Sequence, residues 1–152
     1  MKMRLLPALA ALAIGFVVPA LAQEQNTVDP EVRQQIEAAV MKFDEAFNKH
    51  DAAAIAALYT QDTVQVGFWT GEGDTVVSGQ QAIEKTYAVE FASSPGKLVG
   101  KLVQMYSIGN EMSAIAEWSK DAFKGYIVRI YVRDADTWKI RLEYVILSMT
   151  AR

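Results

Sequence analysis

The chain has 152 residues, 51% of them hydrophobic and 22% charged, and its net charge of −3 leaves no electrostatic footprint for nucleic acid or anionic lipid. It contains no cysteine and one histidine, which rules out disulfides and effectively excludes a zinc or iron site built from those two residue types. These proportions are typical of one globular domain, for which we expect no metal and no cofactor.

Residues 1–22 have the layout of a secretory signal peptide. Lys2 and Arg4 precede an apolar run from Leu5 to Val18, which is too short to span a bilayer. The small residues of the Ala20-Leu21-Ala22 segment suit signal peptidase. We therefore expect cleavage after Ala22 and a periplasmic or secreted mature protein with no attachment to the membrane.

The mature chain is expected to start with a loose polar leader, residues 23–28, and to continue as one domain over residues 29–150. Asp29 is a suitable N-cap, and Pro30 suits the first position of a helix. The apolar residues that follow recur at helical spacing: Val32, Ile36, Val40, Phe43 and Phe47. This pattern predicts an amphipathic helix over residues 30–49.

Shorter elements follow. Asp51 is placed to cap a second, alanine-rich helix over residues 52–58. The period then changes to two over residues 62–68, and the glycine-rich turn at residues 71–74 predicts a short hairpin. With only two carboxylates, that turn is a poor calcium site. A third helix is expected from Ser78 or Gly79 to about Ser93.

The second half of the mature chain has the composition of β-sheet. Long runs of β-branched and aromatic residues are separated by close turns, which predicts an antiparallel meander. The predicted strands are Leu98 to Ile108, Met112 to Lys120, Phe123 to Arg133 and Trp138 to Met149. Helices first and strands afterwards predict an α+β domain, in which a curved antiparallel sheet wraps around the long N-terminal helix and two shorter helices complete the fold.

Three segments resemble a known family. Residues 47–62 look like its helix, aspartate cap, short helix and "LY-x-x-D" segment before the first strand; residues 77–83 are similar to its "G-x-x-A-I" helix start, and residues 138–140 to its "W-K-I" final strand. The family is the SnoaL-like branch of the nuclear transport factor 2-like superfamily, which also holds ketosteroid isomerase and the SgcJ/EcaC-type proteins. The resemblance covers residues 31–148 and implies a cystatin-like cone with a pocket between sheet and helices, and frequently a homodimer formed through the sheet.

The resemblance does not carry over a reaction. In ketosteroid isomerase-like members a first-strand carboxylate removes the proton, and alignment places Val66 there, which cannot accept one. Phe43 stands at the position of the helix-one tyrosine, and Arg129 at about that of a third-strand carboxylic acid. On this alignment the isomerase mechanism loses all three of its groups.

Strand alternation predicts which residues face a pocket. We expect Val64, Val66 and Phe68 to point inward, together with one face of the last strand: Trp138, Ile140, Leu142, Tyr144 and Ile146. The small residues Ala114 and Ala116 would leave volume for a cavity. Its predicted ligand-binding residues are Tyr59, Val66, Tyr87, Trp118, Tyr126 and Tyr144. An ordinary aromatic core is the alternative for each of these side chains.

The opposite face of the sheet is expected to be a solvated surface or part of a dimer interface. It would carry Ile115, Ile127, Arg129, Tyr131, Arg133, Lys139, Arg141 and Glu143.

Acid and base candidates are few. His50 titrates near neutrality, but its place between a helix end and an N-cap favours a structural role. Asp62 is a turn residue that could also lie at a pocket mouth. These two are weak catalytic candidates.

The sequence thus supports three functional hypotheses. The first is an exported SnoaL-like domain that binds a small apolar or aromatic molecule without an identifiable catalytic base. The second is a cofactor-independent isomerase, dehydratase or cyclase on the same scaffold, using tyrosine hydroxyls with Asp62 or His50. The third is a dimeric module that binds a partner through its sheet. The identity of the small molecule is not indicated.

Overall fold

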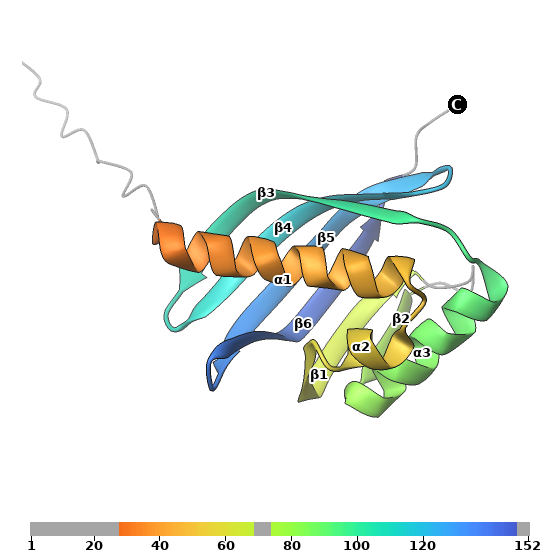
Figure 1. The fold of residues 1–152 in the computed structure, drawn as a ribbon, viewed down its shortest axis with the longest axis horizontal. Coiled ribbons are helices and arrows are strands. Elements are labelled where there is room, and N and C mark those ends of the chain that lie inside the picture. The colour runs from red at the N-terminus through yellow and green to blue at the C-terminus, as the bar shows by residue number, and fades with distance from the viewer. Residues whose placement is uncertain (1–27, 69–73, 149–152) are drawn as a thin grey trace, which may run out of the picture.

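The computed structural model describes residues 28–68 and 74–148, which form three helices and six strands (Figure 1). The predicted signal peptide, most of the leader and residues 71–73 of the glycine-rich turn lie outside these ranges. The helices are α1 (Pro30–Asn48), α2 (Ala52–Ala56) and α3 (Gln80–Ser93). The strands are β1 (Tyr59–Phe68), β2 (Asp74–Ser78), β3 (Leu98–Ile108), β4 (Glu111–Lys120), β5 (Phe123–Asp134) and β6 (Thr137–Leu147).

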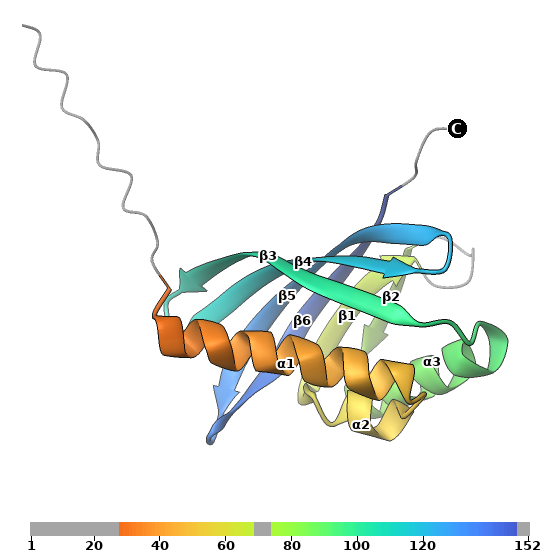
Figure 2. The same ribbon diagram turned by 45° about the horizontal axis from the view of Figure 1, so that its top comes forward.

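Helix α1 lies across the curved sheet, and α2 and α3 cover one end of it (Figures 1 and 2). It begins as predicted, because the Asp29 carboxylate accepts hydrogen bonds from the amides of Glu31 and Val32, and a proline stands in the first turn. Its buried side chains face the sheet: Ile36, Val40, Phe43, Ala46 and Phe47. None of the helices within the described residues is long and apolar enough to cross a membrane.

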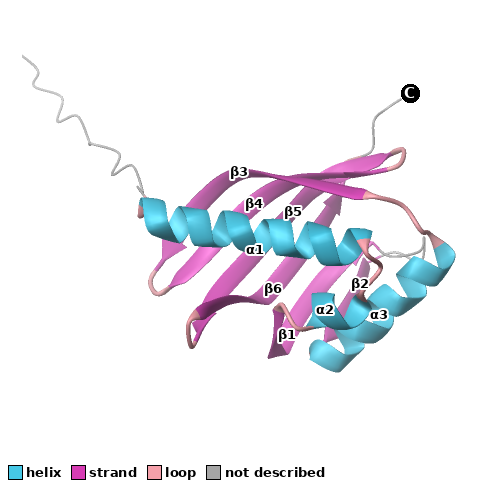
Figure 3. Ribbon diagram, in the orientation of Figure 1, coloured by secondary structure: helices cyan, strands magenta, loops and turns pink. Residues whose placement is uncertain are grey.

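The six strands form one sheet in the order β2-β1-β6-β5-β4-β3 (Figure 3). All neighbours pair antiparallel except β1 and β6, which are parallel. The expected α+β, cystatin-like fold is therefore confirmed, with a mixed rather than wholly antiparallel sheet. The meander of β3 to β6 follows the predicted strands closely.

The inward faces of β1 and β6 differ from the prediction. On β1 the buried residues are Tyr59, Thr63, Gln65 and Gly67, so Val64 and Val66 face the other side. On β6 the pairing with β5 shifts by one residue between Ile140 and Leu142, which is a β-bulge. Because an extra residue reverses which side chains face a given side, the bulge turns the rest of β6 over.

Beyond the bulge, the residues of β6 that were expected to be buried are exposed, and those expected to be exposed are buried. Trp138 and Ile140 face the helices as expected, but beyond the bulge Glu143 and Val145 are buried, while Leu142, Tyr144 and Ile146 are exposed. The same correction applies to β5, where Ile127, Arg129 and Tyr131 are buried on the helix side rather than lying on the outer face. Only β4 shows the predicted alternation, with Met112, Ala114 and Ala116 buried.

Candidate pocket and its buried polar floor

A pocket of about 440 Å³ opens between α1, α3 and the ends of β4, β5 and β6. Its walls are mostly apolar side chains: Phe43, Phe47, Tyr87, Leu98, Trp118, Phe123, Ile127, Val145 and Leu147. Phe123 is 60% exposed at the outer end, whereas Glu143 at the inner end is fully buried. The pocket is thus an apolar hollow that ends on a carboxylate.

Glu143 is held by donors from its two neighbouring strands, β1 and β5, and from α3. Its Oε2 atom accepts hydrogen bonds from the Tyr59 hydroxyl at 3.0 Å and from Arg129 Nε at 2.5 Å. Its Oε1 atom accepts one from Gln65 Nε2 at 2.5 Å and a long one from the Tyr87 hydroxyl at 3.5 Å. Five side chains therefore form one hydrogen-bonded cluster beneath α1.

The charges of this cluster are shielded from water. The Arg129 guanidinium stacks 3.8 Å from the centre of the Phe43 ring. Although burial opposes the charged form, Glu143 and the surrounding tyrosines keep the pKa of Arg129 well above its usual value. Burial and the negative charge of Glu143 raise the pKa of both Tyr59 and Tyr87, so these phenols stay neutral. The cluster is a buried ion pair with neutral hydroxyls around it.

A second carboxylate adjoins the cluster. Asp44 on α1 accepts a hydrogen bond from the Gly100 amide at 2.8 Å, and burial raises its pKa against the opposing effects of that bond and of Arg129. The Tyr131 hydroxyl also interacts electrostatically with Arg129, although neither it nor Arg129 Nη2 has a partner at hydrogen-bond geometry among the described residues.

A separate ion pair lies at the side of the pocket. Lys120 on β4 is nearly buried and binds Glu90 of α3, and its ammonium also donates to the Ser94 hydroxyl at 2.9 Å. These bonds tie the end of α3 to the sheet. They also hold the Lys120 ammonium, paired with Glu90, in the lining of the pocket.

Trp118 lies flat against the sheet because its neighbour on β5 is a glycine. A Cβ atom at Gly125 would overlap the carbonyl oxygen of Ile146 and lie 2.9 Å from the indole nitrogen of Trp118. That nitrogen is buried without a hydrogen-bond partner among the described residues. Trp118 therefore lines the pocket with its ring, while its indole N–H is buried over Gly125.

The predicted ligand-binding residues fall into three groups. Tyr87 and Trp118 line the pocket. Tyr59 lies in the polar cluster behind it. Val66, Tyr126 and Tyr144 face away from the helices and do not line the pocket, so their predicted place is wrong. The β-bulge explains Tyr144, whereas on β1 and β5 the alternation is regular but the opposite face is inside.

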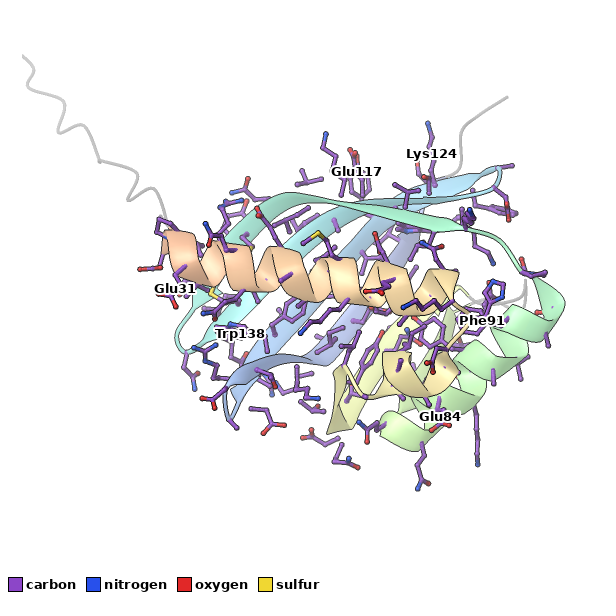
Figure 4. All side chains as sticks on the ribbon, in the orientation of Figure 1. Glu31, Glu84, Phe91, Glu117, Lys124 and Trp138 are labelled. Carbon is purple, nitrogen blue, oxygen red and sulfur yellow. The ribbon has the colours of Figure 1, made fainter. Side chains whose placement is uncertain are left out.

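Neither catalytic candidate lines the pocket. Asp62 is exposed at the start of the sheet. His50 is exposed between α1 and α2, where its φ of 55° is the left-handed conformation expected of a helix stop, and its ring lies 5.0 Å from that of Phe91. Figure 4 shows Phe91 at the α3 end of the molecule and Trp138 near the opposite end of α1. The described residues hold no group of three or more metal-binding side chains.

The residues that sequence reasoning missed are Gln65, Arg129 and Glu143. A signal could be read only with the register known, because counting back from the turn at residues 134–136 would pair Arg129 with Leu142, and it is the β-bulge that makes Glu143 its cross-strand partner. Two opposite charges at paired positions within otherwise apolar strands indicate a buried pair. The ketosteroid isomerase comparison changes accordingly: Gln65, rather than Val66, faces the helices on β1.

Known structures share this fold. A domain of unknown function with a cystatin-like fold from Nostoc punctiforme superposes with a TM-score of 0.69, at 12% identity over 81% of each chain. A ketosteroid isomerase-like protein from Erwinia carotovora atroseptica gives 0.67 at 16% identity, covering 80% of this chain and 100% of the other. An NTF2-like protein of unknown function from Silicibacter pomeroyi gives 0.66 at 13% identity, with the same coverage.

The chain has the cystatin-like fold of the NTF2-like proteins. The sequence itself matches no protein-family model and no curated protein. At these identities the likeness shows the NTF2-like fold alone, and since one such scaffold hosts many activities, function has to be argued from the pocket.

Proposed function

We propose that this NTF2-like domain binds a small, largely apolar or aromatic molecule in the pocket beneath α1 and α3. The main support for this proposal is the pocket. Its volume of about 440 Å³ is in the usual range for small-molecule sites, and its walls are aromatic and aliphatic. A few polar groups converge on it, as such sites require to orient a ligand.

The chemistry of the lining favours binding over proton transfer. Both carboxylates in the lining, Glu90 and Glu143, are hydrogen-bonded to cations, so neither is a free proton acceptor. Asp62 and His50, the titrating groups considered for an enzyme, lie elsewhere. Proton transfer would need a free acid or base in the lining, whereas binding of a small molecule does not.

Filling the pocket tests this function. Ile127→Trp places a large ring into the cavity, whereas Ile130→Trp on the other face of the same strand is the matched control. Naphthalene binding, measured by equilibrium dialysis, should weaken at least about tenfold in Ile127→Trp and remain in Ile130→Trp. Native mass spectrometry of the protein from its own compartment should show a retained small molecule. Equal naphthalene binding by both variants would place the ligand outside this pocket.

The outer face of the sheet supports a second candidate, association with a second copy through that face. Tyr126, Leu142, Tyr144 and Ile146 are each at least 40% exposed, and Tyr126 pairs directly with Ile146 across two strands. Exposed apolar side chains on adjacent strands form the kind of patch that marks a protein interface. Arg129, once expected on this face, is buried on the other.

Light scattering checks the second candidate. Tyr144→Glu should convert a dimer to a monomer, whereas Val99→Glu, on the exposed strand β3 at the sheet edge, should leave the dimer intact. A wild-type protein that remains monomeric at high concentration would contradict it.

A further inference from the structure

The polar side chains that a ligand could reach lie on one wall of the pocket. Glu143 is 0% exposed and Tyr87 is 1% exposed, and the indole nitrogen of Trp118 is buried. The other polar lining residues come from the end of α3 and the end of β4: Glu90, Ser93, Ser94 and Lys120. Ser93 is exposed, and the side chains of Lys120 and Glu90 are 9% and 13% exposed. A ligand in this pocket therefore meets accessible polar side chains on one side and apolar side chains elsewhere.

The Lys120 ammonium lies at the edge of the cavity and has one N–H bond to spare. It is 5.7 Å from the centre of the Phe47 ring, and it donates to Glu90 and to the Ser94 hydroxyl. All three of these neighbours line the pocket, as Lys120 itself does. An ammonium group has three N–H bonds. Two of them have these oxygen acceptors, and the third has none among the described residues.

A second donor stands beside the ammonium. The Ser94 hydroxyl oxygen accepts from Lys120 at 2.9 Å, and its own O–H donates to no acceptor among the described residues. Two donors so close together can both reach one oxygen atom. A carbonyl oxygen has two lone pairs and no hydrogen of its own to place, so it fits this pair of donors.

The charges around Lys120 favour a neutral acceptor over an anion. Glu90 pairs with Lys120 directly. The Asp121 carboxylate is also near, because Asp121 Oδ2 and Lys120 Cε both adjoin the position that a Cβ atom on Gly96 would take. An anion bound to Lys120 would therefore meet two carboxylates at a nearly buried place, where like-charge repulsion is strong. A neutral carbonyl meets no such repulsion and still gains the stronger bond that a charged donor gives.

Building on the proposed binding function, we propose that Lys120 and Ser94 select the ligand: the pocket takes a neutral carbonyl compound with an apolar, ring-containing skeleton. The carbonyl oxygen accepts hydrogen bonds from Lys120 Nζ and Ser94 Oγ, and the skeleton lies against the aromatic walls. Lys120 is then a specificity-determining residue. Glu90 is a positioning residue, since its bond holds the ammonium at the edge of the cavity.

Four compounds with the same ring system test the selection on the wild-type protein by equilibrium dialysis at neutral pH. One is 2-acetylnaphthalene, which has a carbonyl group, and the second is 2-isopropenylnaphthalene, which has a methylene group of similar shape in place of the oxygen. The third, 1-(2-naphthyl)ethanol, has a hydroxyl group, and the fourth, 2-naphthoate, is an anion. We expect 2-acetylnaphthalene to bind most tightly, at least about tenfold more tightly than 2-isopropenylnaphthalene, which is the usual effect of a hydrogen bond from a charged donor.

The outcomes separate the selection from the proposed function. Equal binding of 2-acetylnaphthalene and 2-isopropenylnaphthalene would overturn the selection while supporting a small-molecule pocket. Tightest binding of 1-(2-naphthyl)ethanol would assign the anchor to an acceptor such as Glu90, and tightest binding of 2-naphthoate would make Lys120 an anchor for anions. Either result overturns the selection of a neutral carbonyl. Binding of none of the four would contradict the proposed function, and the selection with it.

A double variant assigns the effect to the ammonium. Lys120→Met with Glu90→Gln removes both charges, so that Glu90 is not left without its cation. This variant should bind 2-acetylnaphthalene and 2-isopropenylnaphthalene with dissociation constants within about threefold of each other. Lys124→Met is the matched control and should keep the preference, because Lys124 is exposed on the same hairpin and points away from the helices (Figure 4). A preference that survives unchanged in the folded double variant would contradict the role of Lys120.

A milder change tests the second donor. Ser94→Ala removes one hydroxyl from a half-buried position at the end of α3. It should weaken the binding of 2-acetylnaphthalene about threefold or more and leave that of 2-isopropenylnaphthalene unchanged. Equal effects on the two compounds would overturn the shared oxygen site. If the double variant does not fold, as judged by circular dichroism, Ser94→Ala and the compound series on the wild-type protein decide.

Discussion

Each charge of the Arg129 and Glu143 pair depends on the other. Their side chains are 4% and 0% exposed, and the pair lies 2.5 Å apart under the Phe43 ring. Removing water from two such ions costs several kcal/mol each, which the attraction between them and the surrounding hydrogen bonds must offset. The pair as a whole therefore adds little to the free energy of unfolding. Removing only one of its two charges, however, should be strongly destabilising.

Single and double substitutions should separate those two effects. Glu143→Leu leaves the arginine cation buried without its partner and should lower the free energy of unfolding by about 3–5 kcal/mol. Adding Arg129→Met should recover much of that loss, because the unpaired charge is gone. Urea unfolding followed by circular dichroism measures both. Additive losses from the two single substitutions would contradict a coupled pair.

The buried tyrosines should make the stability of the folded protein depend on pH in the alkaline range. The pKa values of Tyr59, Tyr87 and Tyr131 are all raised in the folded protein, chiefly by burial. The unfolded chain releases these protons at its ordinary pKa of 10.0, whereas the folded chain keeps them. Proton release thus favours the unfolded state, and stability is intact below pH 10 and falls above it.

We expect cooperative unfolding in this alkaline range, followed by the ultraviolet absorbance of the phenolate. Tyr131→Phe should reduce the steepness of the fall, and Tyr106→Phe, on the exposed strand β3, is the control. Release of all phenolic protons near pH 10 without unfolding would contradict the burial of these hydroxyls.

At the scale of elements, the helices and strands followed from local patterns, but the facing of three strands, β1, β5 and β6, did not. The caps at Asp29 and Asp51 and the runs of β-branched residues are local signals, and the structure confirms the elements they predict. Alternation with a period of two predicts which residues of a strand share one face of the sheet, but it does not predict which face packs against the helices. On β1 the apolar set of Val64 and Val66 lies outside, and the more polar set of Thr63 and Gln65 lies inside.

The same limit explains what was missed at the site. Both sides of the sheet carry apolar residues, and the bulge beside Ile140 is an insertion of one residue that no composition signal marks. The usual rule of apolar inside and polar outside fails where a polar group is buried for a purpose. Glu143 is such a group, and it was predicted on the solvent side.

Helix α1 also protects the edge of the sheet. Strand β3 has no neighbour on one side, and there Asn48 of α1 accepts from the Leu98 amide at 2.8 Å and donates to the Leu98 carbonyl at 2.9 Å. Asp44, one helical turn earlier, takes the Gly100 amide. These side chains replace the hydrogen bonds that another chain would otherwise make with an open edge.

Removing one of these bonds should loosen the edge. Asn48→Ala is expected to lower the free energy of unfolding by about 1–3 kcal/mol and to speed amide hydrogen exchange at Leu98. Glu45→Ala is the control on the same helix, because its pair with Lys49 is exposed and contributes little. Unchanged exchange at Leu98 would show that the edge is held by other contacts.

At the scale of the whole molecule, both sides of the sheet are partly apolar: one is covered by helices and holds the pocket, and the other exposes the patch around Tyr144. Within the described residues, the first element is α1, which starts at Pro30 behind the Asp29 cap. The removal of residues 1–22 as a signal peptide remains a prediction from the sequence.

Maturation can be measured directly. Expression of the full chain in a bacterium with a signal peptidase should give a product that begins at Gln23, identified by intact mass and N-terminal sequencing. Ala20→Lys should block that cleavage, whereas Gln25→Ala should not, because only residues next to the cut are read. A product that retains Met1 and lies in the cytoplasm would contradict the predicted export.

The parallel pairing of β1 with β6 has a consequence for how the chain folds. Tyr59 and Glu143 are 84 residues apart in the sequence, and the pairing that brings them together is made by β6, the last of the described strands. Contacts of such long range are slow to form because the intervening loop must first be closed. Until β6 has been made, β1 lacks its partner towards the centre of the sheet and Arg129 lacks the Glu143 carboxylate, so the sheet of a nascent chain stays open until then.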